Sequence, residues 1–233
     1  MTLHQFITRV LDCAGPLLPA RWRLPVRYYG WVNSSDTEPE LVHLFALCRQ
    51  FRCAVDVGAN HGYYSFKMAR RFQRVCAFEA NPQIDYDIRH YKKSNLHFYA
   101  YGLSDQPRRT NLYVPVHRGI PYIGWANLAN RELPFADAYE TVQVELQRLD
   151  DQVFVWETAV DLIKIDVEGH ELEVLCGGLE TIRRDRPVLI IENNPDQSAA
   201  IQALLEKMGY RKTTLAAWMG VPASSPNLIY LPD

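Results

Sequence analysis

The sequence has little of what marks several specialised classes of protein. Its 233 residues carry a formal net charge of −2, so it lacks the surplus of Lys and Arg that a nucleic-acid-binding surface needs. The five cysteines form no Cys-x-x-Cys pair, which favours free thiols in a reducing compartment. Asp12, Pro16 and Pro19 interrupt the apolar opening, so we expect neither a signal peptide nor a membrane span. We therefore expect a cytoplasmic protein without a nucleic-acid partner.

The first fifty residues differ in charge from the rest of the chain. Their opening thirty carry one acid against four arginines, which are Arg9, Arg21, Arg23 and Arg27. We expect residues 1–50 to form a helical extension that packs on its own domain or on a second subunit. Basic amphipathic segments also bind anionic lipid, so a peripheral contact with a membrane surface is the alternative. The sequence leaves the oligomeric state open.

From residue 51 to residue 233, apolar strand-like runs alternate with amphipathic helical segments. This alternation predicts an α/β domain, with a mostly parallel sheet covered by helices on both faces. The last two strand-like segments, 210–216 and 227–232, could form a hairpin and give the sheet an antiparallel edge. The expected parallel strands are 53–58, 74–80, 96–104, 160–169 and 187–193.

Residues 107–150 break this alternation. Period-two patterns at 110–116 and 140–149 predict two strands, and the segment between them is rich in glycine, proline and aromatic residues. Long irregular segments inside compact domains are often functional. We interpret the region as a substrate-side insertion or lid, with a purely structural wrap as the alternative.

The stretch "VDVGANHGYYS" predicts a strand, a glycine turn and the start of a helix. Its pattern, D-x-G-x-N-x-G from Asp56 to Gly62, lacks the G-x-G-x-x-G of dinucleotide-binding turns, which argues against a nicotinamide dehydrogenase. An acid beside the turn would repel a pyrophosphate but suit an ammonium group. The start of the helix favours a carboxylate. A ligand with both groups at one end, together with a ribose, is S-adenosylmethionine.

Two further segments fit the same ligand. Glu79 follows Gly58 by 21 positions, about where a doubly wound sheet places an acid against a ribose diol. Leu103 and Ser104 follow the third strand and could edge the adenine. The expected cofactor-binding residues are Asp56, Gly58, Ala59, Asn60, Gly62, Tyr63, Ser65, Glu79, Ala80, Asn81, Leu103, Ser104 and Asp166.

Four segments together resemble the FkbM family of S-adenosylmethionine-dependent methyltransferases. They are "DVGANHGYYS", "FEANP", "LIKIDVEGHELEVLCGG" and "RPVLIIE", and the resemblance spans roughly residues 51–192. It implies a class I methyltransferase fold, which is Rossmann-like and doubly wound, with a mostly parallel seven-stranded sheet and an antiparallel edge strand. It also implies methylation of a hydroxyl, commonly on a sugar or a natural product. Residues 1–50 and 120–135 are not fixed by the resemblance, so the acceptor stays open.

The segment "DLIKIDVEGHE" carries many ionisable groups for a buried strand. Lys164, Asp166 and Glu168 share one side of an extended chain, so they either pair with one another or line the cleft. Asp166 should lie at the ligand end of the strand, and Lys164 could pair with it or with Asp161. A hydroxyl acceptor needs a base to take its proton. The candidates are Asp166, His170 and Glu168, and the sequence favours Asp166 or His170 without separating them.

Three carboxylates and several aromatic residues complete the predicted site. Asp166, Glu168 and Glu192 could hold Mg²⁺, although no ligand spacing demands a metal and the metal-free version is favoured. Aromatic faces stack on sugar rings, and amides can hydrogen-bond hydroxyls. The expected substrate-side residues are Tyr122, Trp125, Asn127 and Glu192, with Arg131 as a further donor.

Three functions therefore compete on the sequence. The leading prediction is an O-methyltransferase that acts on a hydroxyl of a glycan, a glycolipid or a glycosylated product. The second is an O-methyltransferase of small natural products, and the third is a non-catalytic module that binds S-adenosylmethionine. Nucleic-acid methylation is not expected, because "DVEG" stands where base methyltransferases commonly carry a [DN]PP[YF] loop.

Overall fold

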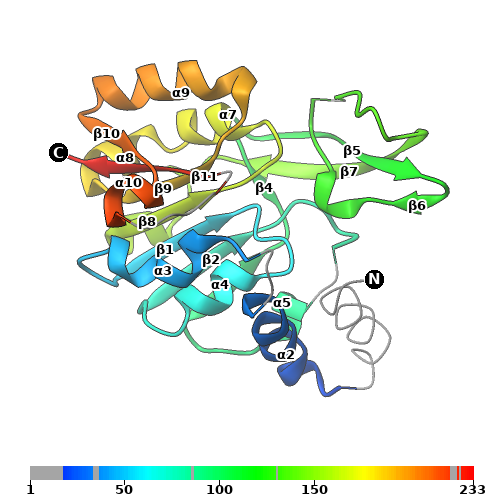
Figure 1. The fold of residues 1–233 in the computed structure, drawn as a ribbon, viewed down its shortest axis with the longest axis horizontal. Helices are drawn as coiled ribbons and strands as arrows, with labels where there is room; N and C mark the ends of the chain where they lie inside the picture. Colours follow the sequence, from blue (N-terminus) through cyan, green and yellow to red (C-terminus); the bar gives the residue numbers. More distant parts are fainter. Residues whose placement is uncertain (1–17, 34–36, 85–86, 130, 221–224, 226) are drawn as a thin grey trace.

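The computed structural model describes residues 18–233 apart from 34–36, 85–86, 130, 221–224 and 226. Arg9, one of the four arginines noted above, lies outside the described residues. The described chain forms a large sheet flanked by helices and a smaller sheet that projects beyond it (Figure 1).

The large sheet has seven strands in the order β10-β11-β9-β8-β1-β2-β3. Its five parallel strands arise from apolar runs: β1 (Cys53–Val57), β2 (Arg74–Phe78), β3 (Leu96–Tyr99), β8 (Val160–Ile165) and β9 (Val188–Glu192). At one edge, β10 (Tyr210–Thr213) pairs antiparallel with β11 (Asn227–Pro232), which also runs antiparallel to β9. The predicted seven-stranded, mostly parallel sheet with antiparallel pairing at its edge is confirmed.

Helices cover both faces of this sheet (Figure 1). One face buries a hydrophobic cluster beneath α2 (Ala20–Val32), α3 (Pro39–Leu47), α4 (Tyr63–Met68) and α10 (Leu215–Met219). The other face packs against α6 (Phe154–Glu157), α7 (Glu171–Cys176), α8 (Leu179–Asp185) and α9 (Pro195–Lys207). A short helix, α5 (Asp87–His90), follows β2 and contacts α2.

The N-terminal helices belong to the same core as the sheet. Leu24 and Tyr28 of α2 and Leu41 of α3 are buried in one cluster with Ala54 of β1. The Nε atom of Arg27 lies 2.7 Å from a carboxylate oxygen of Asp87, and both side chains are almost fully buried. Among the described helices, none is long and apolar enough to cross a membrane.

The smaller sheet has the order β4-β7-β5-β6, and all of its strands except β4 belong to the insertion. Its strands are β4 (Gly102–Leu103), β5 (Arg108–His117), β6 (Ile120–Pro121) and β7 (Ala138–Gln147). The predicted strand 96–104 is thus divided between the two sheets, as β3 and β4. The two predicted period-two patterns thus form the long antiparallel pair β5 and β7. Alternate residues Leu112, Val144 and Leu146 form a small cluster of their own. A 3-10 turn, η2 (Ile123–Trp125), and the bridge between Tyr113 and Asn127 order the segment between the two strands.

Candidate functional site

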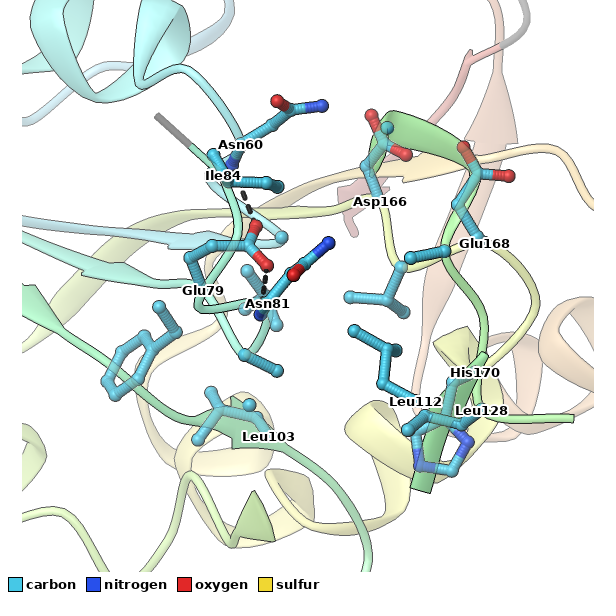
Figure 2. Close-up of a pocket in the computed structure, with 18 of the residues that line it drawn as sticks. Asn60, Glu79, Asn81, Ile84, Leu103, Leu112, Leu128, Asp166, Glu168 and His170 are labelled. Carbon is cyan, nitrogen blue, oxygen red and sulfur yellow. Dashed lines mark hydrogen bonds between the residues drawn. The ribbon is translucent and has the colours of Figure 1, made fainter. Parts of the chain in front are cut away.

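A cleft lies where β1, β2 and β8 end, and residues of the insertion form part of its wall (Figure 2). Its wall combines apolar side chains with a few carboxylate and amide groups, which is typical of sites for small ligands. Ligands of doubly wound sheets bind at this end of the strands. Nine residues predicted for binding or catalysis line the cleft: Gly58, Asn60, Glu79, Ala80, Asn81, Leu103, Asp166, Glu168 and His170.

Glu79 is fixed at the end of β2 by two backbone donors. Its Oε2 accepts a hydrogen bond from the Asn60 N–H at 2.9 Å, and its Oε1 accepts one from the Asn81 N–H at 2.7 Å (Figure 2). Burial raises the pKa of Glu79, and the two backbone donors oppose that effect. Each carboxylate oxygen has a further lone pair for a ligand hydroxyl. Glu79 therefore suits the ribose diol for which it was predicted.

The neighbouring groups also fit S-adenosylmethionine. The Oδ1 atom of Asn60 is buried and has no hydrogen-bond partner among the described residues, so it offers an acceptor to an ammonium or hydroxyl group. Phe78, Ile84 and Leu103 give the same cleft apolar walls that can take a flat base. The acceptor oxygens of Glu79 and Asn60 and the apolar walls thus match both the polar and the apolar parts of the cofactor.

Several predicted cofactor residues are buried around the turn between β1 and α4 and do not line the cleft. Asp56 is fully buried in β1 and does not line the cleft, and its Oδ2 accepts a 2.5 Å hydrogen bond from Ser65 Oγ. Burial raises the pKa of Asp56, while the nearby Lys164 lowers it. Gly62 caps α4 with a φ of 87°, and the ring of Tyr63 stacks on Trp31 with centroids 5.0 Å apart. Ala59 and Ser104 are likewise buried outside the cleft wall.

Gly58 is required by the protein's own backbone. Its φ is +76°, and a Cβ atom built there would lie 1.8 Å from the backbone oxygen of Asp166. Gly58 lines the cleft as predicted, but the group that approaches it most closely is the backbone that follows β8. The turn after β1 and the end of β8 are therefore packed backbone to backbone, and this contact sets the position of Asp166.

Asp166 and Glu168 lie on the opposite side of the cleft from Glu79 (Figure 2), and Glu192 lies close to both of them. Asp166, Glu168 and Glu192 each offer one oxygen, and these oxygens lie within 4.8 Å of one another. Burial, and then the neighbouring Asp166, raise the pKa of Glu168 to about 7. The same two causes raise the pKa of Glu192 to about 9. The sequence analysis proposed this trio as a possible magnesium site, and the structure brings its members together.

Glu168 differs from its two neighbours in its surroundings. Its backbone has a φ of 54°, a left-handed conformation that costs a non-glycine residue free energy. Among the residues that the structure describes, no side chain or backbone group hydrogen-bonds its carboxylate. A strained residue that holds an unpartnered carboxyl group in a cleft is a candidate for chemistry.

Lys164 is buried behind the carboxylates. Its Nζ donates to Asp166 Oδ2 at 2.8 Å, which realises one of the two predicted pairings. The other, with Asp161, does not occur, because Asp161 pairs with Arg52. The interaction with Asp166 raises the pKa of Lys164 against the opposing effect of burial, so this lysine is charged.

A chain of contacts connects Lys164 to residues from the N-terminal and the C-terminal parts of the described chain. Its Nζ lies 4.6 Å from the centre of the Tyr64 ring, and Tyr64 Oη donates to Glu38 Oε2 at 2.7 Å. The same Glu38 oxygen accepts from Asn227 Nδ2 at 2.7 Å. Glu38 precedes α3 and Asn227 begins β11, so this polar network connects Lys164 to both elements.

His170 lines the cleft, but its ring nitrogens face other protein groups. Nε2 lies 2.9 Å from Ser104 Oγ, and Nδ1 lies 3.5 Å from a carboxylate oxygen of Glu173. Burial lowers the pKa of His170, and the charge of Glu173 opposes that effect. Figure 2 shows the ring apart from Asp166 and Glu168. This placement favours a role in packing the start of α7.

The insertion contributes residues that sequence reasoning did not single out. Ile123, Gly124, Ala126 and Leu128 line the cleft, as do Leu112 and Leu146 from the two long strands. The alternation of apolar residues in these strands was a usable signal for the last two. No sequence signal marked the residues in and after η2 as part of the cleft wall, because their positions depend on how η2 folds.

Tyr122 and Trp125 flank the two cleft residues of η2. Their side chains are 39% and 50% exposed, and each ring contacts Phe135, with centroids 5.3 and 5.6 Å apart. Asn127 lies away from the cleft wall: it is buried, and its Oδ1 accepts from the Arg131 N–H. The two aromatic residues are thus exposed next to the cleft wall without lining it, whereas the amide orders the turn.

Arg131 joins the insertion to the far side of the cleft. Its guanidinium lies 3.3 Å from both Asn194 Oδ1 and Asp196 Oδ2, at the start of α9. A Cβ atom added to Gly169 would lie 2.7 Å from the same guanidinium, so the arginine packs over the loop that carries Glu168. The charge of Arg131 also lowers the pKa of Glu168, against the larger effect of burial.

The strand order, the antiparallel β10-β11 pair and the placement of the cleft define a Rossmann-like α/β methyltransferase fold. Within this class, the sequence model of the methyltransferase FkbM domain matches residues 56–212, well over half of the chain. The chain therefore belongs to the FkbM family of S-adenosylmethionine-dependent methyltransferases. No curated protein sequence matches it.

Comparison with solved structures found similar chains at low sequence identity. The FkbM methyltransferase of Methylobacillus flagellatus KT is 18% identical, with a TM-score of 0.55 over 90% of this chain. This chain covers 52% of that protein, or about half of its length. A TehB-like S-adenosylmethionine-dependent methyltransferase of Corynebacterium glutamicum is 13% identical, with a TM-score of 0.47 over 89% of this chain and 94% of its own.

Proposed function

We propose that the protein is an O-methyltransferase that methylates a hydroxyl group of a sugar in a glycan, a glycolipid or a glycosylated product. The observation that carries the proposal is the carboxyl group of Glu168, which lines the cleft without a hydrogen bond from any described residue and has a pKa of about 7. A base poised near neutral pH is what a hydroxyl acceptor needs.

Glu168 suits the role of base better than the two residues that the sequence favoured. Asp166 is held by Lys164, and His170 is held by Ser104 and Glu173. Bound S-adenosylmethionine supplies a methyl group that is already activated on a positively charged sulfur. Glu79 and Asn60 would hold the cofactor, and Glu168 would accept the proton of the acceptor hydroxyl. Most of the remaining work is alignment of the reacting atoms.

The exposed aromatic residues support a carbohydrate acceptor. Tyr122 and Trp125 are displayed beside Ile123 and Gly124 of the cleft wall, and aromatic faces stack on the apolar faces of sugar rings. Glu192, beside Asp166 and Glu168, adds a hydrogen-bonding group on the acceptor side. A small natural product with a hydroxyl group is the alternative acceptor.

The carboxylate trio also permits a metal-assisted version of the reaction. Asp166, Glu168 and Glu192 offer the oxygen ligands that Mg²⁺ prefers, and a bound cation would acidify a coordinated hydroxyl. The same three residues would then act as ligands, and chelation would abolish activity.

The test uses S-adenosylmethionine that carries a labelled methyl group. The protein and its E168Q variant are incubated with fractionated extract of the host, each with and without EDTA. We expect label to enter a polysaccharide or glycolipid fraction with the unaltered protein and to be lost with E168Q. Label in small organic molecules alone would replace the sugar acceptor with a natural product. Saturable cofactor binding without label transfer would contradict catalysis and favour a binding module.

A further inference from the structure

Three segments of the described chain carry cations and aromatic residues and no acids. Residues 18–33, 63–74 and 88–103 contain several Lys and Arg but no Asp or Glu, although the whole chain has a net charge of −2. These segments lie together in the fold, because α2 contacts both α4 and α5 (Figure 1). We call the surface formed by Trp22, Tyr29, Lys67, Arg70, Arg71, Lys92 and Lys93 the basic face.

The helix α2 displays two large aromatic side chains on this face. Trp22 is 54% exposed and Tyr29 is 49% exposed. They are seven positions apart, which places them on the same side of the helix. Leu24 and Tyr28 of the same helix are buried in the core. The ring of Tyr29 packs edge-on against Tyr28 and Phe66, with centroids 5.3 and 6.2 Å apart, yet 49% of Tyr29 stays exposed.

Several cations lie near Tyr29 and α4. Arg70 donates to Tyr29 Oη at 3.0 Å, and its charge also acts on Lys67 and Lys93. Arg71 lies over the ring of Phe51 at 3.9 Å, and Arg70, Arg71 and Lys92 are exposed. Neighbouring like charges repel, so a cluster of this kind is stabilised by an anionic partner.

We propose that the basic face docks the protein on the surface of an anionic lipid bilayer. Trp and Tyr are the residues that settle at the interface between water and lipid, and Lys and Arg are attracted to anionic headgroups. The basic face presents both kinds together on an external surface. The proposal is independent of the acceptor and of the base, since none of its residues lines the cleft.

The test is co-sedimentation of the full chain with vesicles of phosphatidylcholine, with and without phosphatidylserine. We expect binding only with phosphatidylserine, and less of it at high salt, because exposed charges are screened. The double variant R70E/K92E should bind about tenfold more weakly or worse, since each cation near the surface contributes to binding. W22A should also weaken binding, but without changing its dependence on salt.

The matched control is R211E/K212E, which makes the same charge change at exposed positions of β10. We expect it to bind vesicles like the unaltered protein, and retained cofactor binding would report that each variant is folded. An equal loss of vesicle binding in both double variants would overturn the proposal, because binding would then depend on the net charge of the protein and not on the basic face. Absence of binding at low salt, or competition by soluble heparin without any effect of W22A, would also overturn it.

Discussion

Glu168 predicts a specific dependence of activity on pH. Its pKa of about 7 means that the base is protonated in acid and ionised above neutrality, so kcat should rise with pH through about 7 and then level off. E168Q should lower kcat by about 100-fold or more and remove the rise. The exposed Glu132 of the insertion provides the control, and E132Q should leave the profile unchanged. An unchanged rise in E168Q would assign the base to another residue.

The backbone of Glu168 predicts that function and stability oppose each other at this position. At a φ of 54°, alanine keeps the left-handed strain whereas glycine relieves it, a difference of about 1–2 kcal/mol. E168G should therefore melt several degrees above E168A, since about 1 kcal/mol shifts Tm by about 2–4 °C in a chain of this size. Both variants should be inactive. Equal melting temperatures would mean that the loop relaxes once the carboxylate is removed.

The three candidate bases show which features of the site can be predicted from the sequence and which cannot. The sequence placed Lys164, Asp166 and Glu168 together, because side chains alternate along an extended segment, and the Lys164 pair with Asp166 followed from the cost of a buried charge. Which of the three candidate bases lacks a hydrogen-bond partner depends on contacts with residues far away in the sequence. His170 is held by Ser104, which follows a different strand, and no local pattern encodes that contact.

At the scale of elements, the contact between the β1 turn and the end of β8 predicts a large effect of G58A. The added Cβ would collide with the backbone of Asp166, whereas Gly119 has the same left-handed φ and nothing within 4 Å of its Cβ position. G119A should cost only the backbone strain of about 1–2 kcal/mol. G58A should cost more and weaken cofactor binding by about tenfold or more, as measured by titration calorimetry. Similar melting curves for the two variants would refute the collision.

The link between the insertion and α9 predicts a change in acceptor binding. R131M removes the contacts with Asn194 and Asp196, so the acceptor KM should rise by about fivefold, the equivalent of about 1 kcal/mol. Loss of the cation also raises the pKa of Glu168, which should move the pH profile to higher pH. R109M removes a comparable pair with Glu145 on the same hairpin and should change neither quantity. An unchanged pH profile in R131M would mean that Arg131 does not affect the pKa of Glu168.

Helices and strands were predictable from the sequence where a single hydrophobic pattern ran through the whole element. The strands β1, β2, β8 and β9 are buried on both faces and read as apolar runs, and β5 and β7 read as alternating residues. The turn with Ile123 and Gly124 was not predictable as a cleft wall, because its position follows from the hairpin that carries it. The buried place of Asp56 was also missed, since its partner Ser65 belongs to the following helix.

At the scale of the whole molecule, the raised carboxyl pKa values predict that stability falls as pH rises. Glu168 and Glu192 bind protons more tightly in the folded chain than at their ordinary pKa of 4.5. Their contribution is therefore present below about pH 4.5 and is lost as pH rises through about 7 and then about 9. Tm should decline from about pH 6 to about pH 9, and E192Q should flatten the upper part of the decline. A Tm that rises over this range in the unaltered protein would contradict these pKa values.

The shared hydrogen bonds of Glu38 give the N-terminal segment a part in the reaction centre. One oxygen of Glu38 accepts from Tyr64, beneath Lys164, and from Asn227, so residues far apart in the sequence meet behind the cleft. An exchange of the first fifty residues between family members, made to alter what the enzyme recognises, would thus also alter the electrostatic environment of the base. A substitution at Glu38 would therefore act, through Tyr64 and Lys164, on the carboxylate of Asp166 in the cleft.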